Sequence, residues 1–164
     1  MKPSRCLSLL LALCAAPVTA NGPAVLGLCA AHEATQFACP MARGRWIGLC
    51  GTPPKALQYR FGRADAVELQ FPDDAAKGAE QMLFAHYSRY QTERFEVRFE
   101  NRGSEYVVFD YMEAGRRRAG VRVTTEGAKE RELACIGRVT GRLGALEGVL
   151  KCDADNALNG GACR

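Results

Sequence analysis

Apolar and polar residues alternate along most of the chain in short runs that turn residues separate. Between residues 94 and 100, for example, Phe95, Val97 and Phe99 alternate with charged side chains. Successive side chains of a strand point to opposite faces, so this pattern predicts one face against a core and one in water. Similar runs predict strands at residues 35–39, 46–51, 57–62, 67–71, 82–90, 94–100, 106–112, 121–125 and 133–136.

The first two of these strands flank a predicted hairpin turn at residues 43–46. Gly44 suits the first central position of a two-residue type II′ turn. Counting outward from that turn places Cys39 opposite Cys50 in a hydrogen-bonded pair, where Cα atoms lie about 5.5 Å apart. That separation is within the disulfide range, so the pattern predicts a Cys39–Cys50 disulfide.

The C-terminal part has a different pattern. Leu143, Leu146 and Leu150 are three and seven residues apart, which suits one face of a short helix, although glycines lie between them. With about eight short strands before it, we expect an all-β or mainly β fold. The expected architecture is an antiparallel sandwich or flattened barrel with a short C-terminal helix or irregular segment.

The first twenty residues have the features of an export signal. Lys2 and Arg5 are basic, residues 7–16 are apolar but too few to span a bilayer, and Ala20 ends a small-residue cleavage site. We therefore expect a signal peptide at 1–20 and one domain at 21–164. The predicted location after cleavage near Ala20 is the periplasm or the exterior of the cell.

Six cysteines follow the predicted signal, and an even number in an exported protein predicts structural disulfides. Besides Cys39 with Cys50, we expect Cys135 with Cys152 and Cys29 with Cys163, although sequence alone ranks the possible pairings poorly. The spacings match no zinc-binding pattern, so no metal site is predicted.

The charge balance limits the possible partners. The formal net charge is +4, and removing residues 1–20, which include Lys2 and Arg5 but no acidic residue, lowers it to +2. Such a small excess does not favour nucleic acid as a partner. No second apolar stretch reaches the length of a membrane-spanning helix, so none is predicted.

Two arginine-rich segments are candidate binding sites. In residues 59–63, Tyr59 and Phe61 are interleaved with Arg60 and Arg63, whose guanidinium groups suit carboxylates or phosphates. The alternation predicts that Tyr59 and Phe61 point inward and Arg60 outward. Arg60 can instead pair with Glu68 across the sheet. The second candidate is a predicted loop at 114–120, where three arginines would project together toward an acidic surface; they are Arg116, Arg117 and Arg118.

Evidence for catalysis or a cofactor is weak. His86 and Ser88 share a strand face, but no nucleophile-elbow motif surrounds the serine. Asp110 lies between apolar neighbours, which suits a buried acid or, as we favour, a carboxylate paired with arginine. Oxygen-bearing side chains near the C-terminus do not fit a calcium loop; they are Asp153, Asp155, Asn156 and Asn159.

Four short motifs, FAC at 37–39, IGLC at 47–50, LQYRFG at 57–62 and VELQFP at 67–72, resemble a family of small exported bacterial proteins that are described only as uncharacterised. The resemblance covers about the first third of the chain after the signal. It implies a Gram-negative envelope setting and a β-rich domain in which the YRFG segment is a signature, and it implies no activity.

We therefore expect a non-enzymatic binding protein of the periplasm or exterior, with an unknown protein or small ligand as partner and no cofactor. One alternative is an inhibitor of, or immunity protein against, an envelope-targeting hydrolase. This alternative rests on an arginine loop at 116–118 and on the general plan of signal, cysteines and strands that small lysozyme inhibitors share. The other is a hydrolase that uses His86 and Ser88.

Overall fold

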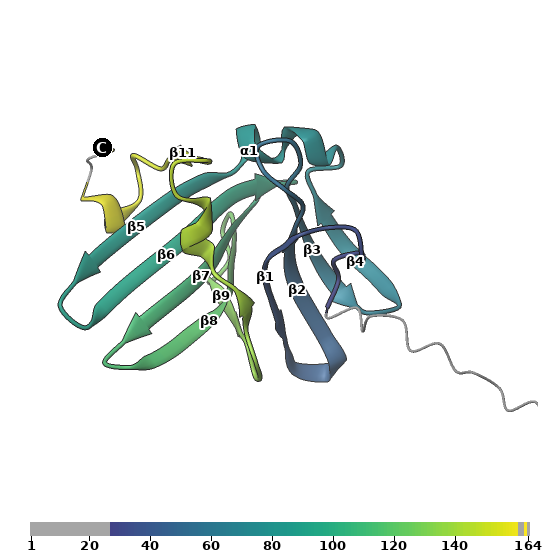
Figure 1. Ribbon diagram of the computed structural model, residues 1–164, viewed down its shortest axis with the longest axis horizontal. Helices are drawn as coiled ribbons and strands as arrows, with labels where there is room; N and C mark the ends of the chain where they lie inside the picture. Colours follow the sequence, from purple (N-terminus) through teal and green to yellow (C-terminus); the bar gives the residue numbers. More distant parts are fainter. Residues whose placement is uncertain (1–26, 161–162, 164) are drawn as a thin grey trace, which may run out of the picture.

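The computed structural model describes residues 27–160 and residue 163, so the predicted signal peptide lies outside the described residues. The described chain forms two β-sheets that pack on each other (Figure 1). The first sheet has the order β10-β1-β2-β3-β4, with β1 Thr35–Pro40, β2 Arg45–Cys50, β3 Gln58–Arg63, β4 Ala66–Phe71 and β10 Thr140–Gly141. The second has the order β11-β5-β6-β7-β8-β9, with β5 Leu83–Arg89, β6 Thr92–Asn101, β7 Ser104–Glu113, β8 Arg116–Thr125, β9 Arg131–Ala134 and β11 Lys151–Cys152.

Neighbouring strands are antiparallel except β11, which runs parallel to β5. The helices are short: α1 at Gly78–Gln81 and four 3₁₀ turns, η1 Ala42–Gly44, η2 Ala75–Lys77, η3 Leu143–Leu146 and η4 Ala157–Asn159. None of these described helices has the length and apolar character that crossing a membrane requires. The mainly β fold with two sheets is as predicted, and the sheets do not close into a barrel.

The alternating pattern determines which face of each strand is buried. Phe95, Val97 and Phe99 all point into the core from β6, as their spacing predicts. Phe99 lies at the centre of an aromatic cluster between the sheets, stacked on Phe71 at 4.6 Å and on Tyr106 at 5.0 Å between ring centroids. The sandwich core is therefore formed by side chains from both sheets.

The prediction of a loop at 114–120 is wrong. Only Ala114 and Gly115 turn the chain, at φ values of 46° and 77°, and β8 already begins at Arg116. A two-residue turn suffices because both positions adopt the left-handed conformation that tight hairpins require. The three arginines therefore lie on a strand, where neighbouring side chains point to opposite faces.

The β1–β2 hairpin also departs from its predicted register. Its turn is η1, three residues long, in which Arg43 and Gly44 have φ values of 62° and 68°. The Met41 N–H donates to the Arg45 carbonyl at 2.8 Å and closes the turn. The predicted two-residue turn is one residue too short and starts in the wrong place.

The new register separates the two cysteines that were predicted to pair. Cys39 lies opposite Ile47 and points into the core, whereas Cys50 is on the outer face. A shift by an odd number of residues moves a side chain to the other face, so Cys39 and Cys50 cannot meet. Cys50 instead bonds Cys29, and Cys39 bonds Cys135.

The other two predicted disulfides are wrong for a similar reason. Cys135 follows β9, and its backbone pairs with that of Met41, just after β1, in an isolated antiparallel β-bridge. This pairing places Cys135 near Cys39 rather than Cys152. This disulfide joins the two sheets. Cys152 bonds Cys163, only 11 residues away, and closes a local C-terminal loop.

The C-terminal leucines are buried as predicted, with Leu143 and Leu146 in η3 fully buried between the sheets and Leu150 almost so. Beyond them the chain runs along β5 and β6 on the outer side of the second sheet (Figure 1). The predicted short helix is thus one 3₁₀ turn followed by irregular structure.

Candidate functional site

The YRFG segment, residues 59–62, has mainly structural contacts. Tyr59 is 1% exposed and packs on Phe99, so burial raises the pKa of its hydroxyl. Gly62 has a φ of 149° at a β-bulge, and a Cβ there would lie 2.4 Å from the Ala66 carbonyl oxygen. Only glycine fits at that position.

Arg60 holds the segment that precedes β1. Its Nη1 and Nη2 bond the two carboxylate oxygens of Glu33 at 2.6 and 2.7 Å, and Nη1 also donates to the Leu28 carbonyl. Gln58 accepts from Arg60 Nε at 2.8 Å. The predicted pair with Glu68 is therefore wrong, because every guanidinium nitrogen of Arg60 already has a partner.

Glu68 pairs with Arg45 of β2 instead, at 3.0 Å from Nε to Oε1. The same guanidinium lies 5.6 Å from the centroid of the Phe61 ring. Arg63, at the end of β3, is exposed and makes no ion pair with any described residue. The structure thus distributes Tyr59, Arg60, Arg63 and Glu68 over different surroundings rather than gathering them into one site.

The three arginines at the start of β8, residues 116–118, are separated in the same way. Arg117 bonds Asp110 with Nε and Nη2, both at 2.8 Å, which confirms that Asp110 is paired with arginine. Arg118 points to the other face, where it bonds Glu132 at 3.1 Å and lies over the Phe109 ring. Arg116 is exposed at the hairpin.

His86 lies between two carboxylates. Its Nδ1 is 2.9 Å from Glu147 Oε1 and its Nε2 is 3.2 Å from Glu93 Oε1, while the ring stacks on Phe95. No hydrogen bond joins His86 to Ser88 in the described structure. Both ring nitrogens therefore face carboxylates instead of a nucleophile.

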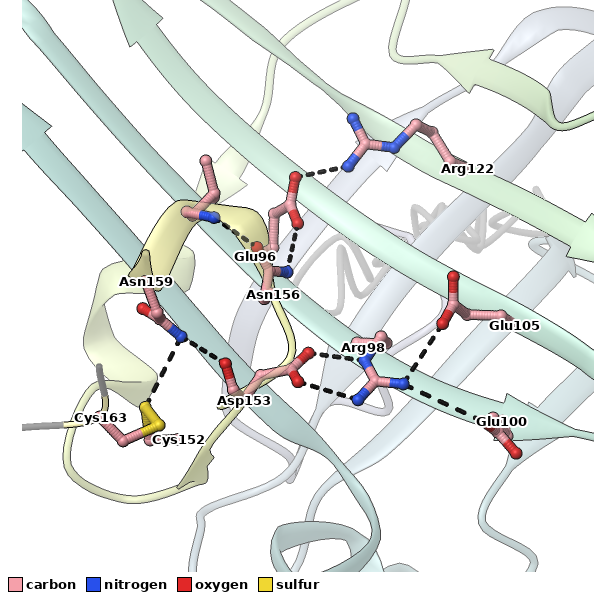
Figure 2. A network of polar contacts seen from close by, with 11 residues as sticks. Glu96, Arg98, Glu100, Glu105, Arg122, Cys152, Asp153, Asn156, Asn159 and Cys163 are labelled. Carbon is pink, nitrogen blue, oxygen red and sulfur yellow. Dashed lines mark hydrogen bonds and ion pairs between the residues drawn. A yellow bond between two sulfur atoms is a disulfide. The ribbon is translucent and has the colours of Figure 1, made fainter. Parts of the chain in front are cut away.

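The polar C-terminal residues fasten that segment to the second sheet, as Figure 2 shows. Asp153 is 1% exposed and receives two bonds from Arg98, at 2.6 and 2.8 Å, which raise the pKa of the guanidinium. Asn159 Nδ2 donates to the Asp153 carbonyl at 2.7 Å. Asn156 Nδ2 donates to Glu96 at 2.7 Å, so these side chains bind protein groups.

Glu96 also binds two other side chains of the sheet. Arg122 forms an ion pair with Glu96, and the Tyr111 hydroxyl donates to the same carboxylate. Burial, together with this hydrogen bond, raises the pKa of Tyr111 to about 12. No group of three histidine, cysteine, aspartate or glutamate side chains among the described residues could hold a metal ion.

A cleft of about 760 Å³ opens between the two sheets, and we call it the inter-sheet cleft. Pockets of roughly 300–1,000 Å³ with mainly apolar walls are typical of small-molecule sites. Its walls come from the β1–β2 turn, β3, the end of β8, the β8–β9 loop and β9. The lining residues are Met41, Ala42, Arg43, Arg45, Phe61, Val123, Thr125, Ala128, Lys129, Arg131, Glu132, Leu133, Ala134 and Ile136.

The cleft shares part of its lining with a cavity in the core of the sandwich. Phe61, Val123 and Leu133 also line a narrower cavity of about 170 Å³, whose other walls are Tyr59, Leu69, Tyr106 and Val121. At the mouth, Ile136 exposes 68% of its surface. Apolar side chains therefore extend from the exposed Ile136 at the cleft to the aromatic cluster between the sheets.

Another cavity, of about 510 Å³, lies along the outer edge of β4. Most of the side chains around it are polar or charged, including Gln70, Asp74, Lys77 and Arg102. Because apolar walls with a few polar groups favour small-molecule binding, the inter-sheet cleft is the better candidate.

Sequence reasoning identified the strands that line the cleft but not the cleft itself. Its basic residues Arg43, Lys129 and Arg131 were not among the candidates, since each looks like an ordinary charged residue near a turn. The exposed Ile136 was the one available signal, because it ends a predicted strand with a large apolar side chain.

No protein-family model matches this chain, and no match to it was found among curated proteins or solved structures. The functional argument therefore depends on the geometry described above.

Proposed function

We propose that this protein is a non-enzymatic binding protein that works outside the cytoplasm and holds an apolar ligand in the inter-sheet cleft. The observation that carries the proposal is the apolar side of the cleft, which includes Ile136, Phe61 and Leu133 and shares the last two with the core cavity. Burial of ligand surface against these side chains favours binding by about 25 cal/mol for each Å² removed from water.

The side chains around the cleft favour binding rather than chemistry. Its lining has no histidine, cysteine or serine, and its ionic groups are three arginines, one lysine and one glutamate. Of these, Glu132 is held by Arg118. Hydrolytic sites usually contain an activated nucleophile or a general base whose pKa is close to the operating pH, and the cleft lining supplies neither.

The export part of the proposal draws on the signal pattern at 1–20 and on the three disulfides, which are compatible with an oxidising compartment. The alternatives have less support. The arginines at 116–118 form no loop to enter an acidic cleft, and His86 faces carboxylates rather than Ser88.

The test uses a neutral fluorescent naphthylamine, whose emission rises in apolar surroundings, with the disulfide-intact protein. We expect saturable binding that Leu133→Trp weakens at least tenfold, because Leu133 lines both the cleft and the core cavity and the larger ring fills space there. Met112→Trp is the matched control, since Met112 is exposed near the other end of the β7–β8 hairpin. No binding by the wild-type protein, or equal binding by both variants, would contradict the proposal.

A further inference from the structure

We infer that the ligand of the inter-sheet cleft is a single-chain amphiphile with an anionic head, whose alkyl chain enters the cleft while the head stays at the rim. This inference rests on the proposed function and names the chemical class of its ligand. Three basic side chains at the rim carry it: Arg43, Lys129 and Arg131.

These rim cations come from two separate parts of the chain. Arg43 belongs to the β1–β2 turn, whereas Lys129 and Arg131 belong to the β8–β9 connection and the start of β9. All three side chains are exposed at the mouth of one cleft. The fold therefore brings together positive charges that lie more than 80 residues apart in the sequence.

The rim cations lack the partners that most other arginines have. Within residues 27–160 and 163, none of the three makes an ion pair or a side-chain hydrogen bond. Seven other arginines are ion-paired, among them Arg60 with Glu33, Arg98 with Asp153 and Arg117 with Asp110, and six more are exposed without an ion pair to a described residue. What distinguishes the rim cations from those six is that all three line one cleft.

No acidic group in the cleft lining is free to compensate this positive charge, and Glu126 in the adjoining β8–β9 loop is exposed outside the lining, without an ion pair to a described residue. Glu132 lines the cleft but is bonded to Arg118, and Glu68 is bonded to Arg45. Glu130, in the β8–β9 loop, does not line the cleft and lies 3.9 Å from Arg122. A ligand head at the mouth thus meets unpaired cations, which favours an anion.

The apolar part of the cleft indicates the shape of the ligand. Phe61, Val123 and Leu133 line both the cleft and the core cavity of about 170 Å³, so an apolar group in the cleft lies against the wall of a much smaller space. An unbranched alkyl chain is slim enough for such a space, whereas a rigid fused-ring body is not. Because Arg45 lies over the Phe61 ring, a cation also stands where head and chain would join.

The experiment compares probes that share a dodecyl chain and differ in the head. Dodecanoate, dodecyl phosphate, dodecanol and dodecyltrimethylammonium each compete with the neutral naphthylamine below their micelle concentrations. We expect both anions to bind at least tenfold more tightly than the trimethylammonium probe. The affinity of dodecanol should lie between that of the anions and that of the trimethylammonium probe. A preference between carboxylate and phosphate then distinguishes a fatty acid from a phospholipid-derived head.

The matched variants carry the same change of charge at two places. Lys129→Glu/Arg131→Glu should weaken anion binding about tenfold or more and leave dodecanol binding unchanged. Arg116→Glu/Arg89→Glu is the control, because both of these exposed arginines lie outside the cleft lining. Raising the salt concentration should weaken the anions but not dodecanol.

The outcomes separate the two proposals. If no probe binds, including the naphthylamine and dodecanol, the proposed function fails. If the neutral probes bind but the anions bind no better than the trimethylammonium probe, only the inferred ligand class is overturned. Equal effects of the rim and control variants would also overturn it, since the positive charge would then act through the whole protein rather than at the rim.

Discussion

Arg60 binds Glu33 through two parallel hydrogen bonds, at 2.6 and 2.7 Å, and so holds the segment before β1 on the outer face of the first sheet. The Cys29–Cys50 disulfide fastens the same segment. The second sheet has the same combination at the other end of the chain, where Arg98 binds Asp153 next to the Cys152–Cys163 disulfide (Figure 2). In each case, a bidentate arginine–carboxylate pair and a disulfide attach a segment near one end of the described chain to a sheet.

Arg60→Ala should lower the free energy of unfolding by about 2–3 kcal/mol. The side chains of Arg60 and Glu33 are only 16% and 17% exposed, so the variant leaves a largely buried carboxylate without its cation. Arg63→Ala on the same strand is the control and should change stability by less than about 0.5 kcal/mol. Urea unfolding measures both, and equal losses would contradict the structural function assigned to Arg60.

The Arg60–Glu33 pair should also make stability depend on pH. Hydrogen bonds from Arg60 lower the pKa of Glu33 below its usual value of 4.5. A carboxyl group with a lowered pKa in the folded state contributes stability above its unfolded pKa and loses that contribution as the pH falls through the folded pKa. The difference in unfolding free energy between wild type and Glu33→Gln should therefore be largest near pH 7 and decrease below about pH 4.

Urea unfolding of both proteins at several pH values between 7 and 3 measures this difference. Glu126→Gln, in the exposed β8–β9 loop, is the control and should give little difference at any pH. A difference for Glu33→Gln that stays constant down to pH 3 would show that the carboxylate contributes no charge interaction.

Asp153→Asn should release the C-terminal segment. Asp153 is 1% exposed and receives both bonds from Arg98, so an amide in its place leaves a guanidinium facing a neutral group. We expect protease cleavage within 154–160 to become at least several-fold faster, while Asp155→Asn, at an exposed position, leaves the rate unchanged. Unaltered cleavage in Asp153→Asn would mean that other contacts hold the segment.

The three disulfides should be reduced in a defined order under native conditions. Cys152 and Cys163 are both exposed, whereas Cys39 is 0% exposed and Cys50 is 1% exposed. A reductant must reach a sulfur atom to attack it, so Cys152–Cys163 should open first. Differential alkylation with mass spectrometry gives the order, and early labelling of Cys39 would contradict it.

Loss of the Cys39–Cys135 disulfide should have the largest effect on stability. It closes the longest loop, with a sequence separation of 96 against 21 and 11 for the others. In the chain-entropy model such a closure stabilises by about 4–5 kcal/mol, compared with about 3 kcal/mol for a short loop. Thermal unfolding of the three double-serine variants tests this ranking, which fails if Cys152→Ser/Cys163→Ser is the least stable.

The strands and their buried faces were predicted well, whereas the turn at 43–46 and the loop at 114–120 were not. The alternation of Phe95, Val97 and Phe99 identified a strand and its buried face, because both depend only on the period of the pattern. Tyr59 was correctly assigned to the core for the same reason. The leucines at 143 and 146 were correctly expected to share a buried face, although the helix is only one turn long.

Contacts between distant residues were not predictable in this way. One error in the length of the β1–β2 turn moved Cys39 away from Cys50, and the choice of all three disulfide partners changed with it. Arg60 could have paired with several carboxylates, and only the path of the preceding segment brings Glu33 to it.

The sequence by itself determined that this chain forms paired strands with one buried face, since the repeat of apolar positions is a local property. Only the tertiary structure decided which cysteines and charges meet and where the sheets leave an opening. The inter-sheet cleft depends on how three separate stretches of the chain pack, and its unpaired Arg43 and Arg131 line the same cleft only after the two sheets have come together.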